Sequence, residues 1–121
     1  MNYRLLAGAE NEIDKILLRS ARQWGIEAAE RYDLLMRAVF GHIGNSPDTP
    51  GSQPISRIAG VRTYPLRLGR ALIEPDRRVG HPRHIVVYRK GTDGVVEIIG
   101  LAHDRMLLDR AARRMQREAG G

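Results

Sequence analysis

The sequence predicts an α+β domain in which a helical hairpin is packed on a small, mainly antiparallel sheet. Two stretches with helical spacing of apolar residues occupy the first 45 residues, and three strand-like runs follow after residue 60. Between the last two runs, Gly91–Gly94 is a turn signal typical of an antiparallel hairpin. With a short apolar run first and an amphipathic stretch last, the expected order is β-α-α-β-β-β-α. The 121 residues suit a single domain, 1–121, with one core.

The first strand is expected at Tyr3–Ala7, before the apolar spacing becomes helical from Ala9 onward. Gly25 is a natural stop for the first helix, since glycine readily adopts the left-handed conformation at a helix end. The second helix begins shortly afterwards and ends at Gly44–Pro47. So short a link predicts an antiparallel pair. The core faces are expected to hold Ile13, Ile16, Leu17, Ser20 and Trp24 in the first helix, and Ala28, Tyr32, Leu35, Met36, Val39, Phe40 and Ile43 in the second.

The second half supplies the remaining strands, at Val61–Leu68, His84–Lys90 and Val95–His103. Residues 45–60 are rich in Pro, Gly and Ser, and form a loop rather than a domain boundary. Residues 69–83 are Arg-rich and interrupted by prolines and glycine, which predicts a long flexible connection. A last helix is expected from Met106 to Met115, followed by a frayed C-terminus.

Positive charge is concentrated in residues 57–90, which hold nine basic and two acidic side chains, a net charge of +7 against +6 for the whole chain. Such a segment suits an anionic partner better than a neutral metabolite, so no small-molecule substrate is expected. Cysteine is absent, which excludes disulfides and thiolate zinc sites, and neither a metal nor a cofactor is expected. There is no signal peptide and no apolar run long enough to cross a membrane, so we expect a soluble cytoplasmic protein.

Short motifs along nearly the whole chain resemble toxins of the ParE/RelE superfamily, in their order and spacing rather than singly. The chain is similar to that superfamily at Ala9, Asp14-Lys15-Ile16, Trp24-Gly25, Tyr32, Pro47, Gly51, Gly60-Val61-Arg62, Arg83–Arg89, Val96–Ile99 and His103–Met106. The superfamily shares the predicted order of elements. The resemblance implies the toxin of a type II toxin–antitoxin module, also described as a plasmid stabilisation protein.

The strand Arg83–Arg89 and the ending His103–Met106 look more like the ParE branch, whose members are regarded as inhibitors of DNA gyrase. This reading needs a binding surface and no catalytic set, in agreement with the absence of paired carboxylates or a P-loop. The expected target-binding residues are Arg62, Arg83, Arg89, His103 and Arg105. Arg62 and Arg105 are expected to be solvated, so alanine there would change stability by no more than about 0.5 kcal/mol.

The resemblance also implies a cognate antitoxin, of a ParD-like type with a ribbon-helix-helix N-terminus. The helical hairpin and the sheet are expected to leave an apolar groove, which a helical antitoxin segment would cover. No antitoxin-binding residues are assigned.

The alternative is a RelE-like, ribosome-dependent endoribonuclease that cuts messenger RNA on the same fold. Cleavage needs proton transfer at the 2′-hydroxyl and cations around the phosphate. His103 is then the acid/base candidate, with Arg62, Arg83 and Arg105 near the phosphate and Tyr88 to orient it. Asp104 is not expected to orient His103, because adjacent residues at a strand end usually point apart. A weaker third possibility is a general nucleic-acid-binding module, although six aromatic residues offer no clear stacking platform. The sequence favours a non-enzymatic inhibitor.

Overall fold

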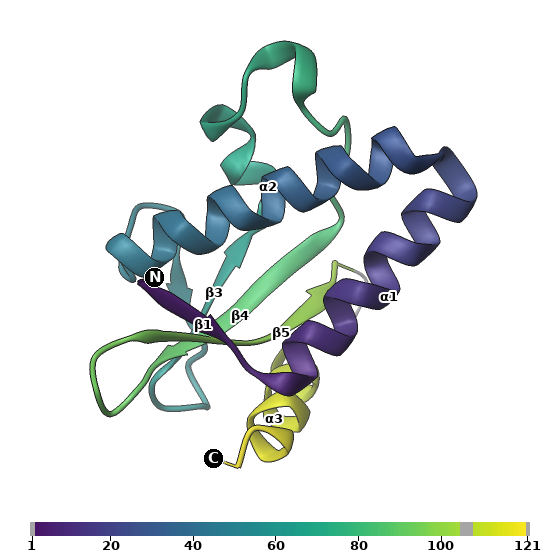
Figure 1. Ribbon diagram of the computed structural model, residues 1–121. Coiled ribbons are helices and arrows are strands. Elements are labelled where there is room, and N and C mark those ends of the chain that lie inside the picture. Colours follow the sequence, from purple (N-terminus) through teal and green to yellow (C-terminus); the bar gives the residue numbers. More distant parts are fainter. Residues whose placement is uncertain (1, 105–107, 121) are drawn as a thin grey trace.

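The computed structural model describes residues 2–104 and 108–120, which form three layers (Figure 1). Over these residues a five-stranded sheet has the strand order β1-β5-β4-β3-β2. β1 (Tyr3–Leu5) lies parallel to β5 (Val96–His103), and the other neighbours are antiparallel. The hairpin of α1 (Ala7–Trp24) and α2 (Ile26–Asn45) covers one face, and α3 (Leu108–Glu118) covers the other. The predicted α+β class and order of elements are confirmed.

The helical hairpin turns at Gly25, whose φ of 96° lies in the region that favours glycine. Its amide donates to the carbonyl of Ala21 at 3.0 Å, which completes the last turn of α1. Side chains from the second half of α2 and from the start of α1 form the larger core with the sheet. The rest of the hairpin extends past the sheet edge (Figure 1).

β4 (His84–Lys90) has the predicted bounds, and β3 (Val61–Pro65) is three residues shorter than predicted. The pairing of β4 with β5 sets His84 opposite His103 and Lys90 opposite Val96. Ile99 is an extra residue on β5, because Val87 faces Gly100 whereas Tyr88 faces Ile98. The sequence did not predict β2 (Gln53–Pro54), a two-residue edge strand beside β3.

α3 lies close to the sheet at Gly100. A Cβ at this position would come within 2.4 Å of the Met115 sulfur. Met115 belongs to a second buried cluster, with Val87, Ile99 and Ala112, on the face opposite the hairpin. The last helix is confirmed from Leu108 onward, while its predicted start at Met106 lies outside the described residues.

Trp24 is a correction to the predicted core. Phe40 is buried as expected, but Trp24 is 76% exposed and Ile26 is 71% exposed at the tip of the hairpin. The helical spacing was read correctly, but α1 extends past the sheet edge, so its last turn has no layer to cover it.

The connection between β3 and β4 contains two short 3₁₀ helices, Leu66–Leu72 and Pro75–Arg77. Leu66 and Ile73 are buried in the larger core, and Gly69 lies directly on Val39 of α2. Arg70 and Arg78 donate to carbonyls of the same segment, those of Val79 and Ile73, both at 2.9 Å. The flexibility predicted for residues 69–83 stays a prediction, although the part that contacts α2 is folded against it.

Candidate functional site

A groove of about 1000 Å³ lies where the hairpin, the connection before β4 and the end of β5 meet. Its apolar lining comes from Ile16, Trp24, Ala28, Val79 and Leu101. Its polar lining includes Lys15, Arg19, Arg31, Tyr32, Arg78, His81, Arg83, His84 and His103. The predicted groove between hairpin and sheet therefore exists, but it is lined with cations as well as apolar side chains.

Tyr32 joins the hairpin to the start of β4. Its hydroxyl lies 2.6 Å from Nδ1 of His84, and the backbone amide of Arg83 donates to its oxygen at 3.3 Å. Which of Tyr32 and His84 donates in the first contact depends on the tautomer of the ring. Burial raises the pKa of Tyr32.

His103 lies beside this pair at the end of β5. Its ring meets that of His84 edge to face, with centroids 5.3 Å apart. Its Nδ1 lies 3.0 Å from a carboxylate oxygen of Asp104, whose other oxygen lies 3.7 Å from the Arg83 guanidinium. The expectation that His103 and Asp104 point apart was wrong, because the strand ends at His103 and the turned backbone at Asp104 frees its side chain to fold back.

Positive charge exceeds negative charge in this groove. Lys15 and Arg19 have no ion pair among the described residues, and Arg31 and Arg83 have loose pairs at 3.7 Å with Glu27 and Asp104. Glu12, the carboxylate in the lining, accepts the backbone amide of Leu101 at 3.3 Å, and burial raises its pKa. The groove therefore presents a net positive surface.

The environment of His84 makes the fold sensitive to acid. Burial, then the charges of His103 and Arg19, lower the pKa of His84 to about 4. Between pH 6.5 and 4 the unfolded ring binds a proton that the folded ring does not, so stability falls as the pH falls. Over this range we expect the wild type to lose about 1 to 2 kcal/mol more unfolding free energy than His84→Gln, allowing for partial exposure of the ring. Urea titrations at both pH values measure this difference, and equal losses would contradict it.

Arg62 and Tyr88 lie away from this groove. They face each other across β3 and β4, near the end of β4 opposite His84. Arg62 donates to the side chain of Ser52 at 2.8 Å and to its carbonyl at 3.3 Å, and the buried Tyr88 hydroxyl donates to the carbonyl of Pro47. Arg62 was expected to be solvated, and its side chain is instead partly buried, because it is bonded to the loop before β3.

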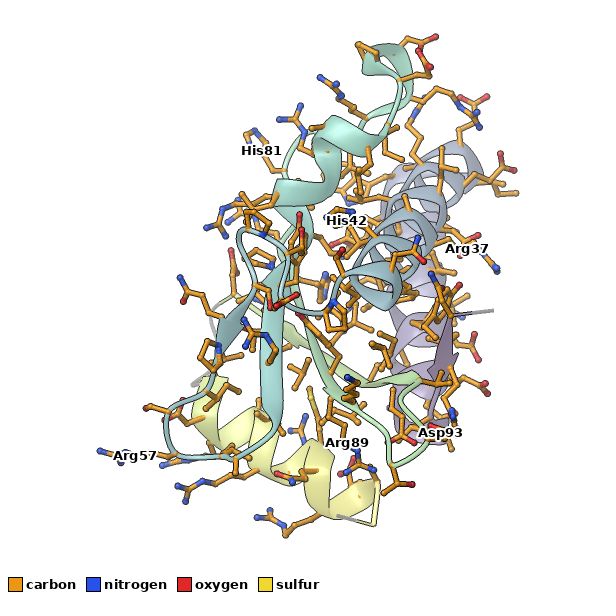
Figure 2. All side chains as sticks on the ribbon, turned by 90° about the vertical axis from the view of Figure 1, so that its left-hand side faces the viewer. Arg37, His42, Arg57, His81, Arg89 and Asp93 are labelled. Carbon is orange, nitrogen blue, oxygen red and sulfur yellow. The ribbon has the colours of Figure 1, made fainter. Side chains whose placement is uncertain are left out.

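Arg89 also lies at the far end of β4, on the α3 side. It donates to Glu97 at 2.8 Å and to the carbonyl of Ala119 at 3.4 Å. Figure 2 shows Arg57 projecting from the opposite end of the molecule to His81, so the basic segment 57–90 does not form one patch. Of the predicted target-binding residues, the structure brings together Arg83 and His103, and Arg105 lies outside the described residues.

The sequence model of the ParE toxin of the type II toxin–antitoxin system, parDE, matches residues 3–108. The chain belongs to the ParE toxin family. The search of curated proteins found no match. Family membership makes this ParE toxin a type II toxin with a cognate antitoxin as its partner. No helix in residues 2–104 or 108–120 is long and apolar enough to cross a membrane.

Sequence reasoning missed much of the groove of this ParE toxin. Lys15 and Arg19 stand one turn apart on the polar side of α1, and such a row usually reads as a solvated face. Tyr32 was read as a core residue, although its hydroxyl required a buried partner. These residues lie beyond the part of the hairpin that the sheet covers, and the sequence carries no signal of how far that cover reaches.

Proposed function

We propose that this ParE toxin inhibits DNA gyrase by binding it, without cutting nucleic acid. The observation that supports the proposal is the separation of the residues that RNA cleavage would need. His103 and Arg83 lie at one end of β4, and Arg62 and Tyr88 lie near the other, where they fix the loop around Ser52. His84, which faces His103, and Tyr88, which faces Arg62, are four residue steps apart along β4, about 13 Å. The bonds of Arg62 and Tyr88 to the loop around Ser52 also keep both side chains from a phosphate held at His103.

The proposed gyrase-binding surface is the exposed end of β4 and β5. Arg83 is exposed there, and the partly exposed His103 is held by Asp104. Arg105 stays a prediction, since it lies outside the described residues. Arg62 and Arg89 stay predictions, and their hydrogen bonds favour a structural role.

Neutralisation by a ParD-like antitoxin is the second part of the proposal. The groove would take a helical antitoxin segment, and acidic side chains on it would meet Lys15, Arg19 and Arg83. Such an encounter is faster at low ionic strength. Co-expression of the protein encoded upstream should restore growth and co-purify with the toxin, and failure of both would contradict this part. Both events place the proposed action in the cytoplasm.

A ribosome-dependent endoribonuclease remains the second candidate because of one contact. Asp104 orients His103, as a carboxylate orients a catalytic histidine, and Arg83 lies beside them. Arg83 and His103 could then act on a phosphodiester without Arg62 and Tyr88.

The substitution His103→Gln distinguishes the two candidates. Glutamine keeps hydrogen bonding but cannot transfer a proton near neutral pH. For an inhibitor, we expect toxin induction to block DNA supercoiling, and His103→Gln to retain part of that inhibition in proportion to its stability. Plasmid topoisomer analysis and primer extension on cellular transcripts measure the two activities, with His42→Gln as a half-buried histidine control outside the groove. Codon-phased transcript cuts that vanish only in folded His103→Gln would establish the nuclease instead.

A further inference from the structure

We propose that the groove between α1 and the start of β4 binds the phosphates and the base of a nucleoside triphosphate. The proposal concerns the isolated toxin and requires neither the gyrase target nor the antitoxin. It adds a small ligand to a protein whose sequence suggested none.

Unneutralised cations supply the phosphate side of the site. Lys15 and Arg19 are one helical turn apart on the groove side of α1, without ion pairs among the described residues. Arg19 is close enough to His84 for its charge to lower the pKa of that ring. Because guanidinium and ammonium groups bind phosphate by charge-assisted hydrogen bonds, this row suits consecutive phosphates.

A donor on the opposite wall points to the same ligand chemistry. Among the described residues Arg83 has one loose ion pair, at 3.7 Å with Asp104, and its side chain is exposed. The Glu12 carboxylate is turned to the Leu101 amide, which lessens its repulsion of an anion.

Trp24 supplies the base side of the site. Its ring belongs to the groove lining yet is 76% exposed, so an indole face remains in water. A nucleobase gains binding free energy by stacking on an aromatic side chain, whereas a simple polyanion gains nothing from it. Lys15 and Trp24 are nine residues apart, about 14 Å along α1 and half a turn around it, so a base on Trp24 and phosphates at Lys15 would span the groove that both residues line. A groove of about 1000 Å³ has room for such a ligand.

Trp24 is the one tryptophan of the chain, so its fluorescence reports on this groove alone. We expect adenosine triphosphate to quench it saturably, inorganic triphosphate to bind at least about fivefold more weakly, and adenosine to bind most weakly. Arg19→Ala should raise the Kd for adenosine triphosphate about tenfold. The matched control is Arg22→Ala, which removes an exposed arginine of the same helix that does not line the groove.

A second variant tests the stacking. Calorimetry measures binding to the variant Trp24→Leu. The substitution should weaken the binding of adenosine triphosphate to the level of inorganic triphosphate, and the binding of inorganic triphosphate should not change. Three results would overturn the proposal. They are equal losses of affinity for adenosine triphosphate from Arg19→Ala and Arg22→Ala, equal affinities of the wild type for the two triphosphates, and no saturation of the quenching up to about 10 mM adenosine triphosphate. The proposal would also be overturned if an acidic amphipathic peptide shifted Trp24 fluorescence and adenosine triphosphate did not, because the groove would then be a protein-binding site. None of these results depends on whether the toxin inhibits gyrase.

Discussion

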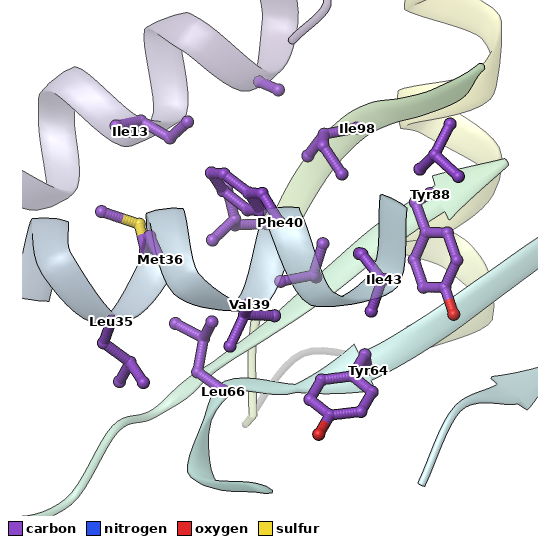
Figure 3. Packing of buried hydrophobic residues seen from close by; sticks show 14 of the residues in the cluster. Ile13, Leu35, Met36, Val39, Phe40, Ile43, Tyr64, Leu66, Tyr88 and Ile98 are labelled. Atoms are coloured by element: carbon purple, nitrogen blue, oxygen red, sulfur yellow. The ribbon is translucent and has the colours of Figure 1, made fainter. Parts of the chain in front are cut away.

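Replacing Phe40 by alanine is expected to lower the free energy of unfolding by about 3 to 5 kcal/mol. The ring is 2% exposed and meets the ring of Tyr3 at a centroid distance of 5.6 Å. Figure 3 shows it among the buried side chains where the hairpin meets the sheet, with Ile13 and Ile98 nearby. Alanine would leave a cavity between two layers that cannot close without moving α2, so the cost should be near the upper end for a phenylalanine.

Urea denaturation followed by far-ultraviolet circular dichroism measures this loss. Domains of this size have about 5 to 15 kcal/mol of stability in all, so Phe40→Ala could be largely unfolded. Phe40→Leu keeps the fold testable, with an expected loss of about 1 kcal/mol. Leu18→Ala is the control, since this half-exposed side chain of α1 should cost no more than about 0.5 kcal/mol. A loss for Phe40→Ala no greater than that for Leu18→Ala would show that the ring does not join the layers.

The elements that depend on contacts between segments close together in the sequence could be predicted from the sequence. The hairpin of β4 and β5 was predicted almost to the residue, because a β-rich run on each side of Gly91–Gly94 leaves few registers. That register, shifted by one residue at the extra Ile99, sets His84 opposite His103 and so fixes the end of the sheet where the groove forms. The stop at Gly25 followed from the same kind of local rule.

Features that depend on the extent of one layer over another could not be predicted. Trp24 has the spacing of a core residue, and only the short sheet beneath α1 leaves it exposed. The contact of His103 with Asp104 depends on how the chain leaves β5, and the bonds of Arg62 depend on a loop from another part of the sequence. Charge clustering in residues 57–90 was read correctly as a basic segment, but antiparallel strands carry its arginines to opposite ends of the sheet.

The connection before β4 shows the same dependence on layers, and Gly69 is where it can be tested. A Cβ added to Gly69 would lie 2.2 Å from Cγ2 of Val39 and 3.4 Å from Cδ1 of Leu35, both on α2. Val39 is β-branched and fully buried, so its side chain has few other rotamers available. Gly69→Ala is therefore expected to cost about 1 to 3 kcal/mol through overpacking, although alanine usually favours a helical turn over glycine.

The matched control for Gly69→Ala is Gly80→Ala in the same connection. No atom lies within 4 Å of a Cβ there, and its φ is not positive, so we expect a stability change near zero. Val39→Ala removes the clashing methyl group, so the double variant Val39→Ala/Gly69→Ala should be about 0.5 to 3 kcal/mol more stable than the two single losses imply. Thermal and urea denaturation of the four proteins measure this coupling. If the two losses simply add, or if Gly69→Ala matches Gly80→Ala, then the connection is not held against α2. The groove wall that carries Arg78 and Arg83 would then be free to move.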